Sequence, residues 1–507
     1  MSTLKDSKVR IGLFLVLFAI IAVSVYSMWS FYCSSTTILG QGMQDGRNSF
    51  SPHTNHPPSN GNIYTPNGDM FKETEHTDTK YAAPLILYSI LFFGVFTIFY
   101  YLFVYKNIIV HKNKKLLVWT ILAAGLLLRI AVAPWVGGFP YDINLFKEWA
   151  TSAAKSLSGF YMNGWSDYPP FFVYILYVVG KIASMQTMNL YFTLLIKLPS
   201  ILADVATAYI MYRLSLKYLS LEISILLSAF YIFNPAIIIN STFWGQVDSF
   251  FTMLIVLAVF TLCEGKIYIA TAIFTVAILM KPQGIIYLPV FFFVLISLKN
   301  VKRFVIAAVT SIATVLMVII PFSLQQDPIW IVKLYSKTIG EYPYGSMNAF
   351  NFFSLIGGNF KPNTTTLFLL NYHVWGLIAI VIVTLFSWFV YIKGRTTKFA
   401  SIAALLQISG VFTFSTSMHE RYLFPAAALS LLAFIYIKDK RLLWLCAGFS
   451  ATIFINTFAV LFRTSGSDGL PYSLPLIITS LLNVLFFIYL IKVGWDIAVK
   501  KKIFTLK

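Results

Sequence analysis

The feature that most constrains this chain is a succession of apolar runs, most of them near the ~20 residues that cross a bilayer as a helix. Only 11% of the residues are charged, whereas a soluble globular chain carries about 25%. A chain with so few charges cannot cover itself with a polar surface, so lipid must be its solvent. We therefore expect an all-α, polytopic transmembrane helical bundle with about 14 spans.

Lys and Arg gather in short runs between the spans, on a single side of the expected bundle. This is the positive-inside pattern, and it accounts for the net charge of +19 without nucleic acid. The pattern holds only if residues 169–185 do not cross the bilayer, so we expect a helix there at the outer membrane surface, with both termini cytoplasmic. The expected spans are 11–32, 83–105, 116–136, 191–213, 221–240, 247–264, 267–281, 284–298, 303–321, 367–392, 398–415, 422–437, 441–461 and 472–493.

Composition divides the chain into five parts. Residues 1–33 form a first span, which we expect to be retained because no small-residue cleavage site follows it. Residues 34–82 form a polar external loop with too little apolar content to fold alone, and 83–115 form a second span and a basic cytoplasmic loop. A core at 116–440 follows, and 441–507 hold the last spans and a basic tail.

Two acidic residues stand out in the first external loop of the core. Asp142 comes just after a span, and Asp167 precedes a pair of prolines. Between them, Leu145–Leu157 has the spacing of a short amphipathic helix with Phe146 and Trp149 on its apolar face. A loop that returns to the surface twice, each time with an acid, predicts the wall of a site.

Three more polar clusters follow spans on the same side. They are Asn240–Asp248, Lys281–Gly284 and Ser417–Tyr422, and a long external loop at 322–366 adds further charges. Ionisable residues at membrane depth are costly and mark functional sites by default. We therefore expect these clusters to meet at one external site.

Each cluster also has an ordinary structural interpretation. Asp142 could be a solvated loop acid, and Asp167 and Asp248 could each cap the helix that follows. Lys281 could extend to the membrane interface, and residues 419–421 could be a surface ion-pair cluster. The common side of the clusters favours the functional interpretation.

Asp204 is a separate case, because it lies inside an expected span. Lys197 precedes it on the same span. We interpret the two as a buried structural pair, outside the site.

In this order, the clusters resemble the GT-C superfamily of glycosyltransferases. The resemblance rests on Asp142, on Asp167-Tyr168-Pro169-Pro170, on Trp244-Gly245-Gln246-Val247-Asp248, on Lys281-Pro282-Gln283 and on Met418-His419-Glu420-Arg421-Tyr422. It is closest to the endoplasmic-reticulum glucosyltransferases that use dolichyl-phosphate-glucose, and to the GPI-anchor mannosyltransferases and their bacterial relatives. It covers roughly residues 116–440.

The resemblance implies an inverting hexosyltransferase, with a hexose of the mannose or glucose class carried on a polyprenyl phosphate. Asp142 would be the general base on the acceptor hydroxyl. The sequence has no Asp-x-Asp in this loop, which favours a mechanism without metal or other cofactor. The implied donor-phosphate ligands are Lys281, His419 and Arg421, and the implied substrate-binding residues are Asp167, Tyr168, Trp244, Gln246, Asp248, Gln283 and Glu420.

Partners and location follow from the same resemblance. The acceptor would be a lipid-linked glycan, a polymer or a protein, and the active site would face outside. We favour a bacterial plasma membrane over the endoplasmic reticulum. The alternatives are a transporter or flippase of lipid-linked sugars, which should carry its charges near the bilayer midplane, a membrane-embedded glycan polymerase or ligase, and a non-catalytic scaffold.

Overall fold

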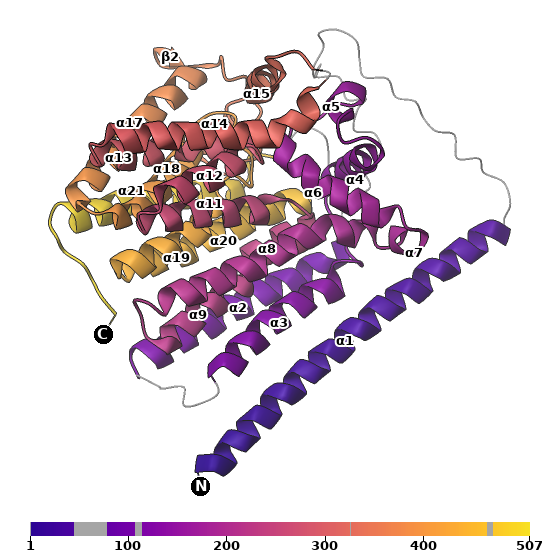
Figure 1. The fold of residues 1–507 in the computed structure, drawn as a ribbon. Helices are drawn as coiled ribbons and strands as arrows, with labels where there is room; N and C mark the ends of the chain where they lie inside the picture. Colours follow the sequence, from indigo (N-terminus) through magenta and orange to yellow (C-terminus); the bar gives the residue numbers. More distant parts are fainter. Residues whose placement is uncertain (1, 45–78, 107–113, 325, 464–469, 507) are drawn as a thin grey trace.

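The computed structural model describes residues 2–44, 79–106, 114–324, 326–463 and 470–506. They form a bundle of long helices (Figure 1), and the one sheet among them is a two-stranded hairpin. The elements α4 to α7 gather on the right of Figure 1, and α15 and β2 lie along its upper edge. We call the end of the bundle that carries these elements the site end.

Nine helices in the described part of the chain are long and apolar enough to cross a membrane. The chain is therefore a multi-pass integral membrane protein, as predicted. Five of the fourteen expected spans are shorter apolar helices, so the total stays a prediction; these five are α3 (Lys114–Val132), α11 (Asp248–Cys263), α12 (Ile267–Ile278), α13 (Leu288–Ser297) and α19 (Pro425–Ile437).

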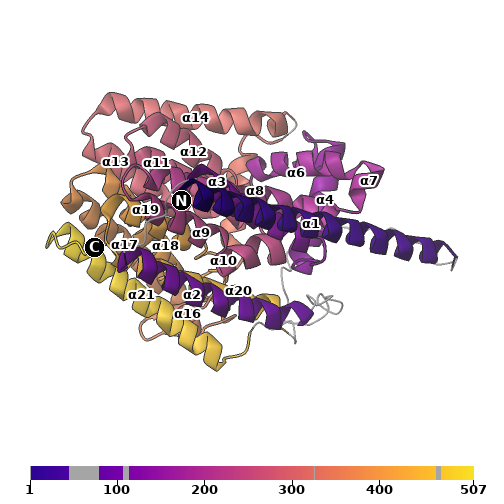
Figure 2. The same cartoon turned by 90° about the horizontal axis from the view of Figure 1, so that it is seen from below.

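The long helices match the expected runs to within a few residues at most ends. All residues of α19 are buried, and α19 lies between flanks formed by α14 and α21 (Figure 2). The long helices are α1 (Ser2–Gln44), α2 (Ala82–Val104), α8 (Phe192–Ser215), α14 (Val301–Ser323), α17 (Tyr372–Gly394), α18 (Ala400–Phe414), α20 (Arg441–Leu461) and α21 (Leu474–Ala498).

The first helix is longer than expected. α1 continues to Gln44, beyond residue 34, where the polar loop was predicted to begin. Extending an existing helix costs less than nucleating one, and no proline interrupts 34–44. Most of the predicted disordered loop, residues 45–78, lies outside the described residues.

One crossing is a broken helix. α9 (Leu221–Ile232) is followed by α10 (Pro235–Ile238) and by the π-helix η2 (Ile239–Trp244). Pro235 cannot donate to the α9 ladder, and the Asn234 side chain restarts the helix by accepting from the Ala236 amide at 3.0 Å. The break delivers Trp244 and the turn after it to the site end.

Two short helices form a platform at the site end. α4 (Pro140–Lys155) packs along α6 (Pro170–Ala183), and Gly180 permits the contact because a Cβ there would lie 2.0 Å from the Ala150 carbonyl oxygen. The Phe171 amide donates to the Leu279 carbonyl at the end of α12. The platform is completed by α5 (Phe160–Asn163) and by α7 (Gln186–Asn189), which leads directly into α8.

The segment after α14 covers the site end. Residues 322–366 of it were predicted as an external loop. The segment contains α15 (Trp330–Gly340), α16 (Phe352–Leu355) and a hairpin of β1 (Thr366–Leu367) and β2 (Leu370–Asn371). The hairpin occupies the first residues of the span expected at 367–392, and α17 begins only at Tyr372. The strands are antiparallel, with Thr366 opposite Asn371. The remaining short elements are the 3₁₀ helices η1 (Thr79–Tyr81), η3 (Pro282–Tyr287) and η4 (Thr397–Phe399).

Candidate functional site

A cavity of about 1870 Å³ opens at the site end. Its wall includes the first turn of α4, the end of η2, the turn from α12 into η3 and the loop after α18. The structure therefore brings the predicted clusters together. The predicted residues that line the cavity are Asp142, Asp167, Tyr168, Trp244, Lys281, Gln283, His419, Glu420 and Arg421.

Asp142 is held by one oxygen only. Its Oδ2 accepts hydrogen bonds from the Trp244 indole Nε1 at 2.6 Å and from the Gln246 Nε2 at 2.5 Å. No described residue donates to Oδ1. Because Pro140 favours the first helical position, α4 begins before Asp142, and not at Leu145 as predicted. The acid therefore lies in a helical turn, with one oxygen anchored and the other free.

The contact between the end of η2 and the start of α4 depends on two glycines, one in each segment. Gly245 has φ of 89° and Gly138 has φ of 93°, a region that residues with a Cβ rarely adopt. A Cβ on Gly138 would also lie 2.9 Å from the Trp244 carbonyl oxygen, which accepts from the Phe139 amide at 2.9 Å. These contacts fix the start of α4 against the end of η2.

Asp248 is part of a buried ion pair. Its Oδ1 lies 2.5 Å from the Lys281 Nζ, and its Oδ2 accepts from the Asn240 Nδ2 at 2.9 Å. The side chain does not cap α11, which it was alternatively expected to do. Lys281 is only 3% exposed, so it does not extend to the interface either.

Arg421 joins the acids of the site. Its Nη1 lies 2.5 Å from Glu420 Oε1 and 3.8 Å from Asp142 Oδ2, and its Nε lies 3.6 Å from Asp248 Oδ2. Its guanidinium also lies 4.7 Å from the centre of the Trp244 ring. Burial lowers the pKa of Arg421, but the three carboxylates more than offset this and raise it. Arg421 is therefore a permanent cation at the centre of the site.

His419 is uncharged near neutral pH. Burial, together with the charges of Arg421 and Lys281, lowers its pKa to about 3. Its ring lies against the rings of Tyr342 and Tyr422, at centroid distances of 4.7 and 5.0 Å. Its predicted contact with a phosphate would thus be a hydrogen bond from a neutral imidazole.

Asp167 is a carboxylate of the site with a hydrogen bond that the described residues leave unmet. Burial, and after it the Glu341 and Asp142 charges, raise its pKa to about 7, and its Oδ1 is buried without a partner among the described residues. Pro169 occupies the N-cap of α6, and no side chain caps that helix. The capping interpretation of Asp167 is therefore wrong.

Tyr168 connects the first loop to the centre of the site. Its hydroxyl lies 3.4 Å from Gln246 Oε1, and Lys281 Nζ lies 5.5 Å from the centre of its ring. Gln246 and Asp248 do not line the cavity themselves, but both support residues that do.

The cavity continues as an apolar arm away from the charges. On α17 the arm is lined from Leu377 to Trp388, so it extends about 17 Å along that helix. Sequence reasoning missed the arm, because its side chains have the same apolar character as side chains that face lipid. The arm is lined by Ile285, Leu288, Pro289, Phe292, Phe293, Ile296, Leu377, Ile380, Thr384, Trp388, Gln407 and Val411.

Arg463 also lines the cavity and was not predicted. It lies just after α20, at the site end. The positive-inside rule places few cations on that side, so an arginine following the expected span 441–461 was a usable signal. No described carboxylate lies within ion-pair distance of it.

Two buried charges in α8 lie outside this cavity. Asp204 pairs with Arg129 of α3, with 3.3 Å between Oδ2 and Nε. Lys197 instead donates to the carbonyls of Val136 and Ala133 at 2.5 and 3.2 Å. The predicted Asp204–Lys197 pair is therefore wrong, although both residues have structural roles.

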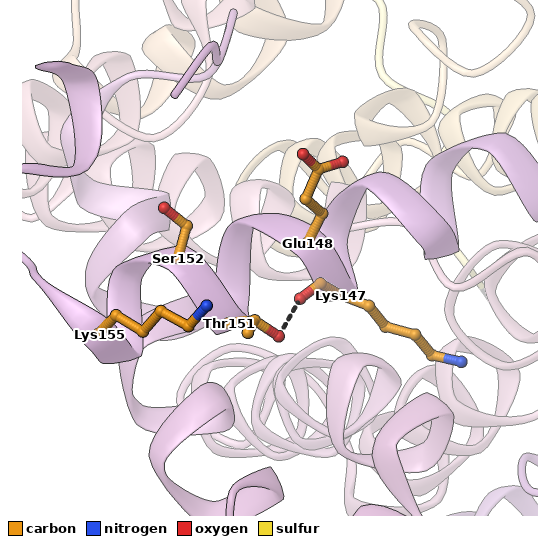
Figure 3. Close-up of a pocket in the computed structure, with 5 residues that line it drawn as sticks. All are labelled: Lys147, Glu148, Thr151, Ser152 and Lys155. Atoms are coloured by element: carbon orange, nitrogen blue, oxygen red, sulfur yellow. Dashed lines mark hydrogen bonds between the residues drawn. The ribbon is translucent and has the colours of Figure 1, made fainter. Parts of the chain in front are cut away.

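A second, shallow pocket lies on α4 alone (Figure 3). Its side chains are spread along one helix, and its one hydrogen bond joins the Thr151 hydroxyl to the Lys147 carbonyl at 2.8 Å. No groups converge there, so it is a weak candidate for a binding site. The pocket is lined by Lys147, Glu148, Thr151, Ser152 and Lys155.

The described residues contain no cluster of side chains that could bind a metal ion. No three His, Cys, Asp or Glu side chains group there as a metal site needs. The mechanism without metal stays a prediction. No protein-family model matches this sequence, and no curated protein is significantly similar to it.

Proposed function

We propose that the protein is an inverting, GT-C-type glycosyltransferase that moves a hexose from a polyprenyl phosphate to an acceptor hydroxyl on the external membrane face. One observation carries the proposal: a centre of carboxylates and cations is continuous with a long apolar arm in the same cavity. A sugar on a lipid phosphate has the same two parts, a polar head and a long apolar tail.

The proposed donor would lie in the cavity with its tail in the apolar arm and its phosphate at the polar centre. Its tail would lie along α13, α17 and α18, where burial of each CH₂ is worth about 0.8 kcal/mol. Its phosphate would then reach Lys281, Arg421 and the neutral imidazole of His419. Charge-assisted hydrogen bonds from such groups stabilise a phosphate that gains charge as it leaves.

The transfer step requires a base close to the anomeric carbon. The acceptor oxygen attacks this carbon, the bond from the carbon to the phosphate oxygen breaks, and its electron pair leaves with the polyprenyl phosphate. The acceptor proton passes to Oδ1 of Asp142. Trp244 and Gln246 hold Oδ2, so the free oxygen has a fixed direction, as a general base needs.

The remaining predicted residues surround the position of the sugar. Asp167, Gln283 and Glu420 offer acceptors for sugar hydroxyls, and Tyr168 and Trp244 offer aromatic surface. Both rings already lie near a cation, Lys281 and Arg421 respectively. They would thus link sugar recognition to phosphate recognition.

A transporter of lipid-linked sugars is the principal alternative. It should place charges along its path near the middle of the bilayer. The ionisable residues that line this cavity lie at its site end, and the mid-helix pair Arg129–Asp204 does not line it. This distribution favours transfer over transport.

The test compares sugar release from synthetic polyprenyl-phosphate-hexoses by the wild type and by Asp142→Asn. General-base catalysis contributes about 10²–10⁴-fold, so we expect a loss of at least about 100-fold with donor binding retained. Glu148→Gln is the matched control, since Glu148 lies on the same helix outside the cavity. Full turnover in Asp142→Asn would remove the assignment of the base. Transport of an intact donor without sugar release would favour the alternative.

A further inference from the structure

The two cations at the centre of the cavity already have counter-ions. Lys281 pairs with Asp248, and Arg421 lies within 4 Å of Glu420, Asp142 and Asp248. Three carboxylates therefore face two cations. The donor phosphate would already compete with these carboxylates for Lys281 and Arg421, so a second anion at this centre would be attracted weakly.

Arg463 is a cation of a different kind in the same cavity. Its side chain is partly buried, and no carboxylate of the described residues lies within ion-pair distance. A partly buried guanidinium with no carboxylate nearby can still form charge-assisted hydrogen bonds to an anion. Its planar fork matches phosphate oxygens in a bidentate geometry. An incoming phosphate would provide a counter-ion that the described residues do not.

Arg463 is also separate from the apolar arm. It follows α20, which packs mainly against α19, α21, α10 and η2. The arm is built from α13, α17 and α18. Arg463 therefore follows a helix that packs against η2, which supplies Trp244, and that is not among the helices lining the arm.

We propose that Arg463 forms an anion subsite for the acceptor, and that the acceptor carries a phosphate group close to the hydroxyl that receives the sugar. This inference rests on the proposed transferase function. Arg463 and Asp142 line the same cavity, so an acceptor held by Arg463 would present its hydroxyl in the space that Asp142 also lines. The subsite would select phosphate-bearing acceptors over neutral glycans.

A binding measurement tests the subsite without any turnover. The probe is inorganic pyrophosphate, which has no tail to occupy the arm, titrated by calorimetry into the full-length protein in micelles of neutral detergent. We expect weak binding that falls about tenfold in Arg463→Gln and partly recovers in Arg463→Lys. Arg303→Gln is the control, because Arg303 is an exposed arginine in the first turn of α14, at the end of that helix away from the site end. Equal affinity of wild type and Arg463→Gln would overturn the proposal.

Kinetic measurements then distinguish whether Arg463 binds a phosphate of the acceptor or the phosphate of the donor. If sugar transfer is established, Arg463→Gln should raise the KM for a phosphate-bearing acceptor about tenfold and leave the KM for the polyprenyl-phosphate donor unchanged. A raised KM for the donor alone would assign Arg463 to the donor phosphate and overturn the proposal. If no transfer is found at all, the calorimetry still decides whether Arg463 binds an anion, so the two failures are distinguishable.

Discussion

The Trp244 indole donates a 2.6 Å hydrogen bond to Oδ2 of Asp142, across 102 residues of sequence. The bond joins the end of a broken membrane helix to the first turn of a short helix at the site end. The same indole lies beneath the Arg421 guanidinium and stacks on Phe139. Trp244 therefore orients both the proposed base and the central cation.

Replacing Trp244 by Phe should separate these two functions. The Phe ring keeps the stacking surface but lacks the N–H, so Asp142 loses one of its two anchors. Displacement of a reacting group by about 1 Å can cost about 10²-fold in rate, and we expect kcat to fall about tenfold to hundredfold. The measurement is sugar release at saturating donor.

The matched control for this substitution is Trp444→Phe, because Trp444 is exposed on α20 and does not line the cavity. Its turnover should equal that of the wild type. Normal turnover in Trp244→Phe would show that Gln246 alone is enough to orient the carboxylate.

The raised pKa of Asp167 predicts that the stability of the protein depends on pH. Its pKa is raised to about 7 in the fold, against an ordinary value of 3.8. Between these values the unfolded chain binds fewer protons than the folded chain, so stability falls as pH rises through this window. Asp167→Asn removes the ionisation. Its Tm should exceed that of the wild type at pH 8, and the difference should vanish near pH 4.

The control for the pH dependence is an aspartate whose pKa is shifted in the opposite direction. Asp327 is exposed, and its hydrogen bond with Lys333 lowers its pKa. Asp327→Asn should therefore gain no stability at pH 8. An Asp167→Asn variant whose Tm follows that of the wild type at every pH would show that the carboxyl is solvated.

Membrane spans and polar residues at helix ends could be predicted from the sequence, because each local pattern is compatible with few structures. The 21-residue run 441–461 coincides with α20, because a long apolar run between basic residues has few other structures. The polar residues at helix ends, such as Asp248 and Lys281, were found for the same reason: a charge beside an apolar run is costly without a purpose.

The sequence failed where the answer depends on a distant neighbour. Asp204 is paired with Arg129 on another helix, not with Lys197 on its own. Ile380 and Leu385 are both apolar residues of α17, yet one lines the cavity and the other is exposed. Composition cannot distinguish them, because lipid and a lipid-binding arm favour the same side chains.

The Lys281–Asp248 pair should be strongly coupled in stability. Removing one partner of a buried ion pair leaves an uncompensated charge and costs about 3–5 kcal/mol. Lys281→Met should therefore lower the Tm markedly. Asp248→Asn should lower it more, because it leaves the buried Lys281 without a carboxylate among the described residues, whereas Lys281→Met leaves Asp248 beside Arg421.

A double-mutant cycle measures this coupling. The variant Lys281→Met with Asp248→Asn should be more stable than the sum of the two single losses predicts, by at least ~1 kcal/mol in the free energy of unfolding. Strictly additive losses would mean that the two charges are screened by water in the cavity.

The apolar arm should set the preference for donor tail length. Ile380 lines the arm about 12 Å along α17 from its start, as eight residues at ~1.5 Å each separate it from Tyr372. Ile380→Trp fills that space with a larger side chain. We expect it to raise the KM for a long polyprenyl donor at least about tenfold and to change the KM for a short-tailed donor little, because a short tail ends before the obstruction. Leu385→Trp is the control, since Leu385 is exposed on the same helix and does not line the cavity. Equal effects of Ile380→Trp on both donors would place the tail elsewhere on the protein and leave only the polar centre of the cavity for the substrate.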